Sequence, residues 1–214
     1  MLLRRHATQS RAGFSLIELL AVMVILSILM TFLAFRLGAL GGAAKQETTR
    51  SFLQQVALAA NTYETEMGDY PTSSWKADWG PTPNKQNLGG EALCVQLWSK
   101  DYGGSGISDD KLINMDGDEA KKSLTTHGNN DLFELRDAWD NPIAYFHRQD
   151  YNREDVYLTL DEEDSLDTSL VKAVKNPKTG NYFNPRSYQL ISAGEDGLFG
   201  TKDDLYNFTV ERED

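Results

Sequence analysis

Glu18 is the one acidic residue inside an apolar run that extends from Gly13 to Phe35. A carboxylate near the core of a lipid bilayer costs roughly 2.5 kcal/mol or more, so such a group is expected to have a partner and a function. A cationic group on a neighbouring molecule would neutralise Glu18 when two such segments pack together. The alternative is an ordinary signal anchor, in which Glu18 lies among the lipid headgroups without a role.

A second group of acidic residues, Asp196, Asp203 and Asp204, lies in a glycine-rich stretch near the C-terminus. Glycines allow the backbone to fold back on itself, so the three carboxylates are expected to converge. Crowded carboxylates repel, and Ca²⁺ would relieve that repulsion with carbonyl oxygens of Leu190 or Ser192 as further ligands. The spacing is not that of an EF-hand. The alternative is a solvated acidic turn.

Other candidate sites are weaker. Asp116 and Asp118 flank a glycine, but two acids in a turn are common and make a poorer metal site. The three histidines, His6, His127 and His147, are scattered. No nucleophile elbow, paired-histidine zinc motif, phosphate-binding glycine loop or Cys-x-x-Cys pair is present in the sequence. We therefore expect a protein that is not an enzyme.

A long helix must position Glu18. From Leu19 to Phe35 there are 17 residues without a charge, and with the preceding turn about 22 residues can cross ~30 Å of hydrocarbon at ~1.5 Å per residue. Residues 45–67 carry apolar side chains at three- and four-residue spacing, which predicts an amphipathic second half. Glycines at 38, 41 and 42 lie between the halves. Because glycine weakens a helix by up to about 1 kcal/mol, they predict a flexible joint.

The remainder predicts a compact α+β region. Gly68 and Pro71 are expected to end the long helix, and a second helix is predicted over residues 91–100. The expected strands are 143–146, 156–160, 188–192 and 207–210, and the other parts of 73–130, with 148–155 and 161–167, are expected to be loops. The fold class is thus α+β, with a long N-terminal helix packed on a small antiparallel β-sheet.

The charge pattern indicates export. The formal net charge is −11, and removing the first 13 residues with their three arginines would lower it to −14. By the positive-inside rule the basic N-terminus stays cytoplasmic and the acidic remainder crosses the membrane. An acidic protein is not expected to bind nucleic acid. Cys94 is the only cysteine, so it has no internal disulfide partner and is expected to be a small buried side chain.

The N-terminal residues resemble a known signal. Gly13, Phe14 and Glu18 are arranged as in the processing and assembly signal of type IV pilins and type II secretion pseudopilins, where glutamate is the fifth residue after the leader. The resemblance implies that a prepilin peptidase cuts after Gly13 and methylates the new amino terminus at Phe14. The amine of Phe14 would then neutralise Glu18 of a neighbouring subunit, and this pairing would set the axial register of a filament.

Two further stretches resemble the major pseudopilin of type II secretion. Residues 137–142 are similar to the turn that opens its sheet, the alternative being a generic Asn-Pro turn under a buried Trp139. Residues 187–208 resemble its C-terminal calcium loop, although the glycine-containing gap is shorter here and includes Lys202. The resemblance implies a structural Ca²⁺ whose ligands come from Asp196, Asp203, Asp204, Leu190 and Ser192. Residues 73–136 and 148–186 exceed the typical length and are expected to form inserted loops.

The expected organisation is a prepilin leader over 1–13, a transmembrane half-helix over 14–37, an amphipathic periplasmic half over 38–72 and a periplasmic globular α+β domain over 73–214. The resemblance implies a subunit that resides in the bacterial inner membrane with a cytoplasmic N-terminus. Polymerisation through the helix would then form a periplasmic pseudopilus that drives protein export. The implied partners are further copies of the chain, other pseudopilins, prepilin peptidase, and an inner-membrane assembly platform with its ATPase.

Other functions remain open. A type IV pilus subunit would serve adhesion or motility, but most such pilins have a C-terminal disulfide loop, which one cysteine forbids. A minor, tip-type pseudopilin would often lack the acid at the position of Glu18. A membrane-anchored periplasmic binding protein or enzyme would need no cleavage before the apolar run.

Overall fold

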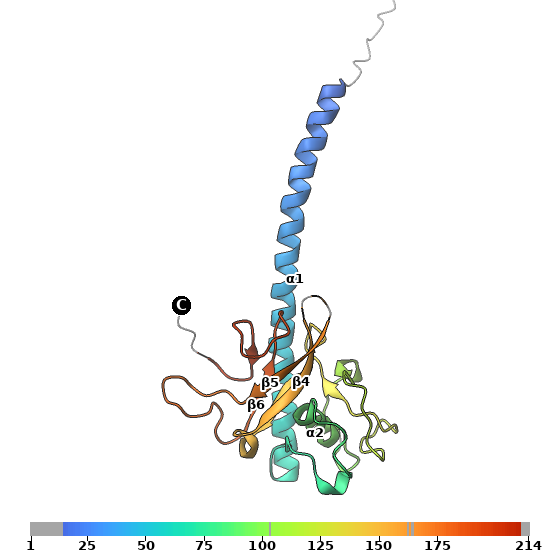
Figure 1. The fold of residues 1–214 in the computed structure, drawn as a ribbon, viewed down its shortest axis with the longest axis vertical. Coiled ribbons are helices and arrows are strands. Elements are labelled where there is room, and N and C mark those ends of the chain that lie inside the picture. Colours follow the sequence, from blue (N-terminus) through green and yellow to red (C-terminus); the bar gives the residue numbers. More distant parts are fainter. Residues whose placement is uncertain (1–14, 103, 162, 164, 211–214) are drawn as a thin grey trace, which may run out of the picture. The chain divides into compact units, whose positions relative to one another are not determined.

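The computed structural model describes residues 15–102, 104–161, 163 and 165–210, with the side chains of residues 32 and 34–40 outside the description. The helices are α1 (Leu16–Met67) and α2 (Leu88–Leu97), and single 3-10 turns lie at Ala77–Trp79, Asp109–Lys111 and Arg148–Asp150. The strands are β1 (Leu112–Ile113), β2 (Glu134–Leu135), β3 (Ala144–His147), β4 (Glu154–Leu160), β5 (Leu166–Lys172), β6 (Tyr188–Ser192) and β7 (Leu205–Tyr206) (Figure 1). The fold is α+β with small antiparallel sheets, as expected.

The chain forms two compact units, Met1–Gly42 and Ala43–Asp214. α1 contains 52 residues and includes the glycines at 38, 41 and 42, so the long helix expected from the sequence continues through them. Their role as a flexible joint stays a prediction. Within the described part of the chain, no helix combines the length and apolar character required to cross a membrane. That finding does not support the expected transmembrane half-helix over 14–37, which also stays a prediction.

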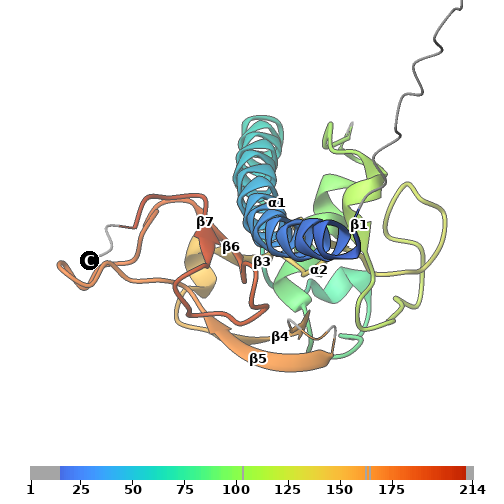
Figure 2. The ribbon, with the colours of Figure 1, turned by 90° about the horizontal axis from the view of Figure 1, so that it is seen from above.

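The main core of the second unit lies along the apolar face of α1. Phe52, Leu53, Val56 and Ala60 are at most 5 % exposed, at the three- and four-residue spacing that predicted this face. They pack in one cluster with Leu93 and Leu97 of α2 and with the buried residues Tyr145, Tyr188 and Leu190 of the sheet. Within this unit, α2 and the sheet lie between the end of α1 and the β4–β5 hairpin (Figure 2).

The strands form three separate antiparallel sheets instead of one. β3, β6 and β7 make a three-stranded sheet in the order β3-β6-β7, whereas β1 pairs with β2 and β4 pairs with β5. A second apolar cluster fills the space between the first sheet and the hairpin, with Phe146 and Ile191 on one side and Tyr157 and Val171 on the other. The sheets thus share apolar cores, and the N–H of Tyr145 on β3 also donates to the Tyr157 hydroxyl of β4 at 3.1 Å.

Several element boundaries predicted from the sequence were wrong. α2 begins at Leu88 instead of residue 91, β7 precedes the strand expected over 207–210, and β1, β2 and β5 were not expected. β5 has only Val171 buried, and Leu166 and Leu170 on it are 60 % and 66 % exposed. Because most of its side chains face solvent, β5 has no apolar alternation to detect, and its hydrogen bonds to β4 hold it in place.

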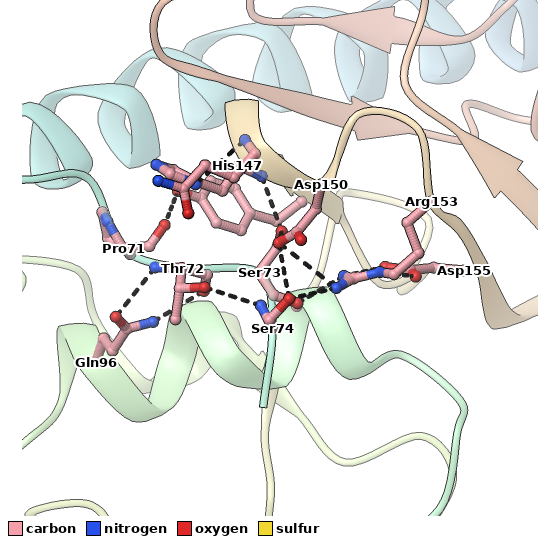
Figure 3. Close-up of polar contacts among 12 residues, drawn as sticks. Pro71, Thr72, Ser73, Ser74, Gln96, His147, Asp150, Arg153 and Asp155 are labelled. Atoms are coloured by element: carbon pink, nitrogen blue, oxygen red, sulfur yellow. Dashed lines mark hydrogen bonds and ion pairs between the residues drawn. The ribbon is translucent and has the colours of Figure 1, made fainter. Parts of the chain in front are cut away.

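α1 ends where the sequence predicted. Gly68 has φ +88°, a left-handed conformation that glycine adopts without steric cost, and its N–H donates to the Glu64 carbonyl at 2.8 Å. The next residues cross to the sheet. The Tyr145 hydroxyl donates to the Pro71 carbonyl, and the Gln96 amide bonds both the N–H and the carbonyl of Thr72 (Figure 3). These contacts fix the segment after α1 on the core.

Candidate functional site

Glu18 lies in the first turn of α1 and caps it. The N–H of Ser15 donates to Glu18 Oε2 at 2.9 Å, while the Ser15 carbonyl accepts from the N–H of Leu19 at 3.1 Å. This is the return half of a capping box, in which the third helical residue satisfies the N–H of the cap residue. Gly13 and Phe14, the predicted processing residues, lie outside the described part of the chain. Glu18 therefore has a local role in the single chain, and its predicted role in assembly stays open.

The helix around Glu18 exposes apolar side chains. Leu16 is 83 % exposed, Ile17 72 % and Met30 69 %. The hydroxyls of Ser27 and Thr31 donate to the carbonyls four residues earlier, at 2.7 and 2.9 Å. Their hydrogen bonds are thus satisfied inside the helix, which suits a surface that meets an apolar environment rather than water.

The acidic side chains of the C-terminal loop accept hydrogen bonds from donors in or next to the loop. Asp203 Oδ2 accepts from the N–H of Asp196 at 2.9 Å, and Asp196 Oδ1 accepts from the N–H of Leu198 at 2.8 Å. Asp204 Oδ2 accepts from the N–H of Gly200 at 2.8 Å and from the hydroxyl of Tyr206 at 2.9 Å. By accepting from N–H and O–H groups of residues 196–206, these carboxylates stabilise the fold of the loop.

Of the two carbonyls predicted as further ligands, that of Leu190 accepts from the N–H of Asn207 at 3.3 Å. The side chain of Ser192 is also engaged, since its hydroxyl donates to Asp137 Oδ2 at 2.6 Å. Asp196, Asp203 and Asp204 are not part of the group of acidic side chains that comes close enough to hold a metal ion among the described residues. The calcium site of this loop stays a prediction.

The pKa values of the loop differ with their surroundings. Burial raises the pKa of Asp204 to about 6, although the N–H of Gly200 and the hydroxyl of Tyr206 oppose the shift. Burial also acts to raise the pKa of Asp203, but the hydroxyl of Thr201 and the N–H of Asp196 outweigh it and the pKa is lowered. At neutral pH Asp203 is therefore held as a carboxylate by its donors.

A different group of acids converges inside the second unit. Glu91 of α2, Asp116 of the loop after β1 and Glu134 of β2 each place one carboxylate oxygen within 4.8 Å of the others. Burial raises the pKa of Glu91 to about 10 and that of Glu134 to about 8, with further contributions from the neighbouring acids. The sequence analysis considered Asp116 and Asp118 and missed the two glutamates, because no local pattern connects four acids on three segments.

Ser73, His147 and Asp150 lie together but are not connected as a catalytic triad. Ser73 Oγ donates to Asp150 Oδ2 at 2.7 Å and accepts from the backbone N–H of His147 at 2.9 Å (Figure 3). The imidazole Nδ1 of His147 accepts from the N–H of Gln149 at 3.5 Å, so the ring is not the base for the serine. Arg153 Nη1 donates to Ser74 Oγ at 2.6 Å. These hydrogen bonds hold the segment after α1 against residues 147–153.

Comparison with known proteins gives one match. Residues 8–34 match the family model of the prokaryotic N-terminal methylation motif, the type IV pilin-like signal. The match covers Gly13 and Phe14, the predicted processing residues, and the first part of α1. No curated protein and no solved structure matches the chain. The motif supports a pilin-like protein that is anchored in a membrane, and it does not distinguish a pilus from a pseudopilus.

Proposed function

We propose that the chain is a structural subunit of a pilin-like filament, and more specifically of a type II secretion pseudopilus. The observation that carries the proposal is the methylation motif over residues 8–34, which overlaps the start of α1 at Leu16. Prepilin peptidase cuts after Gly13 and methylates the amine of Phe14. The chain is held in the bacterial inner membrane by its first helix, with the C-terminal unit in the periplasm, and it does no catalysis.

The exposed apolar side chains of α1 support polymerisation. Side chains such as Leu16 and Ile17, at 83 % and 72 % exposure, gain free energy wherever they leave water, at about 25 cal/mol per Å² of buried apolar area. Lipid provides one apolar environment and a bundle of identical helices provides another. A subunit extracted from the membrane by the assembly platform and its ATPase is therefore stabilised by joining other helices of its kind.

Glu18 sets the register in this proposal. In the single chain its Oε2 accepts from the N–H of Ser15 at 2.9 Å, one residue after the amine that cleavage would create. In the filament the carboxylate of Glu18 accepts a charge-assisted hydrogen bond from the amine of Phe14 on an adjacent subunit. Both charges then lie in an apolar bundle, where an unpaired one is costly.

The choice of a secretion filament over a surface pilus has narrower support. Cys94 is free and buried, so the chain has no C-terminal disulfide loop of the kind most type IV pilins have. The other pseudopilins are its expected partners in the filament. Calcium in the C-terminal loop would favour the same choice and remains part of this finer proposal, although the arrangement of Asp196 and Asp203 does not support it.

The test replaces Glu18 in cells that carry the assembly machinery. We expect Glu18→Ala to lower filament yield by more than about tenfold, because the amine of the neighbouring subunit is left unpaired in the bundle. Glu47→Ala is the matched control, since Glu47 is an exposed acid further along α1, and it should assemble normally. Filaments are quantified after shearing and cross-linking.

Mass spectrometry of the purified protein completes the test. Both variants should begin at a methylated Phe14, since cleavage depends on Gly13 and not on the paired acid. Normal yield of Glu18→Ala filaments would remove the electrostatic register from the proposal. A mature chain that still begins at Met1 would contradict the processing step and favour an anchored binding protein.

A further inference from the structure

Three segments of the second unit bring four carboxylates together. Glu91 lies in the first turn of α2, Asp116 and Asp118 flank Gly117 in the loop after β1, and Glu134 lies on β2. Oxygens of Glu91, Asp116 and Glu134 are all within 4.8 Å of one another, and this is the one such group among the described residues. Asp118 lies beside this group, and its negative charge contributes to raising the pKa of both glutamates.

Five oxygens of this cluster are buried without a donor. Glu91 and Glu134 are 0 % exposed. Both oxygens of Glu91, both of Asp118 and Oδ1 of Asp116 are buried and have no hydrogen-bond partner. None of the four acids takes part in an ion pair between described residues. A buried carboxylate without a donor is costly, so this arrangement differs from a solvated acidic turn.

Surrounding side chains hold the remaining oxygens in fixed directions. Asn84 Nδ2 donates to Asp116 Oδ2 at 2.8 Å, and Asn87 Nδ2 donates to Glu134 Oε1 at 3.0 Å. The N–H of Met115 donates to Glu134 Oε2 at 3.2 Å. Hydrogen bonds of this kind orient the ligands of metal sites. They leave both oxygens of Glu91 and Oδ1 of Asp116 without a partner inside the cluster.

The backbone that carries these acids is also fixed. Asn114 closes the turn at Gly117, since its Nδ2 donates to the Asp118 carbonyl at 2.8 Å and its Oδ1 accepts from the Asp118 N–H at 3.1 Å. The start of α2 is held by the N–H of Gly90, which donates to the Tyr157 hydroxyl at 3.1 Å. The acids are therefore positioned by the fold and do not depend on a flexible loop.

We propose that Glu91, Asp116, Asp118 and Glu134 form a binding site for a divalent cation, and that the cation is Ca²⁺. All the available ligands are oxygens, which favours a hard cation over zinc or copper. Ca²⁺ accepts six to eight oxygens in irregular geometry, whereas Mg²⁺ requires a near-ideal octahedron at about 2.0–2.1 Å. The cation ties α2 to the loop after β1 and to β2. The site is independent of the filament role.

Thermal unfolding of the full chain in detergent tests the proposal, with chelator, Ca²⁺ or Mg²⁺ present. Calcium at about 100 times its dissociation constant should raise the melting temperature by about 5 °C or more, because it binds the folded state only. Mg²⁺ at the same concentration should raise it less. Wild-type protein that shows no shift in millimolar calcium would overturn the proposal.

Charge-removing variants locate the cation. Glu91→Gln and Glu134→Gln should lose the calcium shift, because each replaces an anionic ligand with a neutral amide. Glu119→Gln, an exposed acid of the same loop, and Asp203→Asn in the C-terminal loop should keep the full shift. Retention of the shift by both glutamate variants would overturn the proposal, and loss in Asp203→Asn alone would move the cation to the C-terminal loop.

Direct binding covers the case in which a variant does not fold. Equilibrium dialysis of wild-type protein followed by elemental analysis should find calcium bound in a one-to-one ratio to the chain. No bound calcium in folded wild-type protein would overturn the proposal without any variant.

Discussion

The acidic residues of this chain differ in whether their carboxylate oxygens accept hydrogen bonds. Asp196 and Asp203 in the C-terminal loop accept N–H donors of their own loop, whereas Glu91 and Asp118 have oxygens with no donor at all. A carboxylate that already accepts hydrogen bonds is stable as an anion, and one without donors requires a proton or a cation. The structure thus makes the second group the stronger candidate for a metal, which is the reverse of the ranking that the sequence suggested.

His147 provides a pH prediction at the same scale. It is 2 % exposed, and burial lowers the pKa of its imidazole from 6.5, with the charge of Arg148 adding to the effect. The unfolded chain therefore binds the proton more readily than the folded protein, and stability contributed by neutral His147 is lost as pH falls below about 6.5. His147→Gln should remove this part of the pH dependence, measured as the free energy of urea unfolding at about pH 7.5 and pH 5.

If the wild type and His147→Gln lost the same free energy between pH 7.5 and pH 5, the buried imidazole would have no part in acid destabilisation.

At the scale of the elements, the C-terminal loop approaches the end of β4 most closely at Gly197. Gly197 has φ +69°, and a Cβ there would overlap the Leu160 carbonyl oxygen. Gly200 has φ +87° with nothing within 4 Å of such a Cβ. We expect Gly197→Ala to lower the free energy of unfolding by about 3 kcal/mol and Gly200→Ala by about 1 kcal/mol, since only the first adds a clash to the unfavourable φ.

Urea unfolding of the two alanine variants measures this difference. Equal losses would show that the loop moves away from β4 at little cost, and the contact between Gly197 and Leu160 would then carry no stability.

Elements with a strong local signal were predictable and others were not. β6 occupies Tyr188–Ser192 as predicted because all five residues are buried, and the apolar spacing of α1 from Phe52 onward identified the buried face. β5 was missed because its partner strand, not its own sequence pattern, holds it. The acid cluster was missed because Asn87, at φ 53°, and the turn at Gly117 bring its segments together, and tertiary contacts of this kind have no signature in one stretch of sequence.

At the scale of the whole molecule, the second unit contains its own cores. The apolar clusters are built from residues after Ala43, whereas the exposed apolar side chains from Leu16 to Leu33 belong to the first unit. We expect a fragment of residues 43–214 to be soluble without detergent and to unfold in one cooperative thermal transition, while the full chain requires detergent.

Size-exclusion chromatography and circular dichroism of the fragment and the full chain check this expectation. A fragment that is unfolded, or that aggregates as the full chain does, would show that the first unit contributes to folding of the second.

The burial of Cys94 affects how readily this chain oxidises when many copies lie close together. Its thiol is 2 % exposed and lies in α2, inside the largest apolar cluster, so oxidants and other thiols reach it only when α2 leaves the core. Covalent dimers are thereby suppressed even at high local concentration. The rate at which an alkylating reagent modifies Cys94 in native protein then measures how often α2 opens.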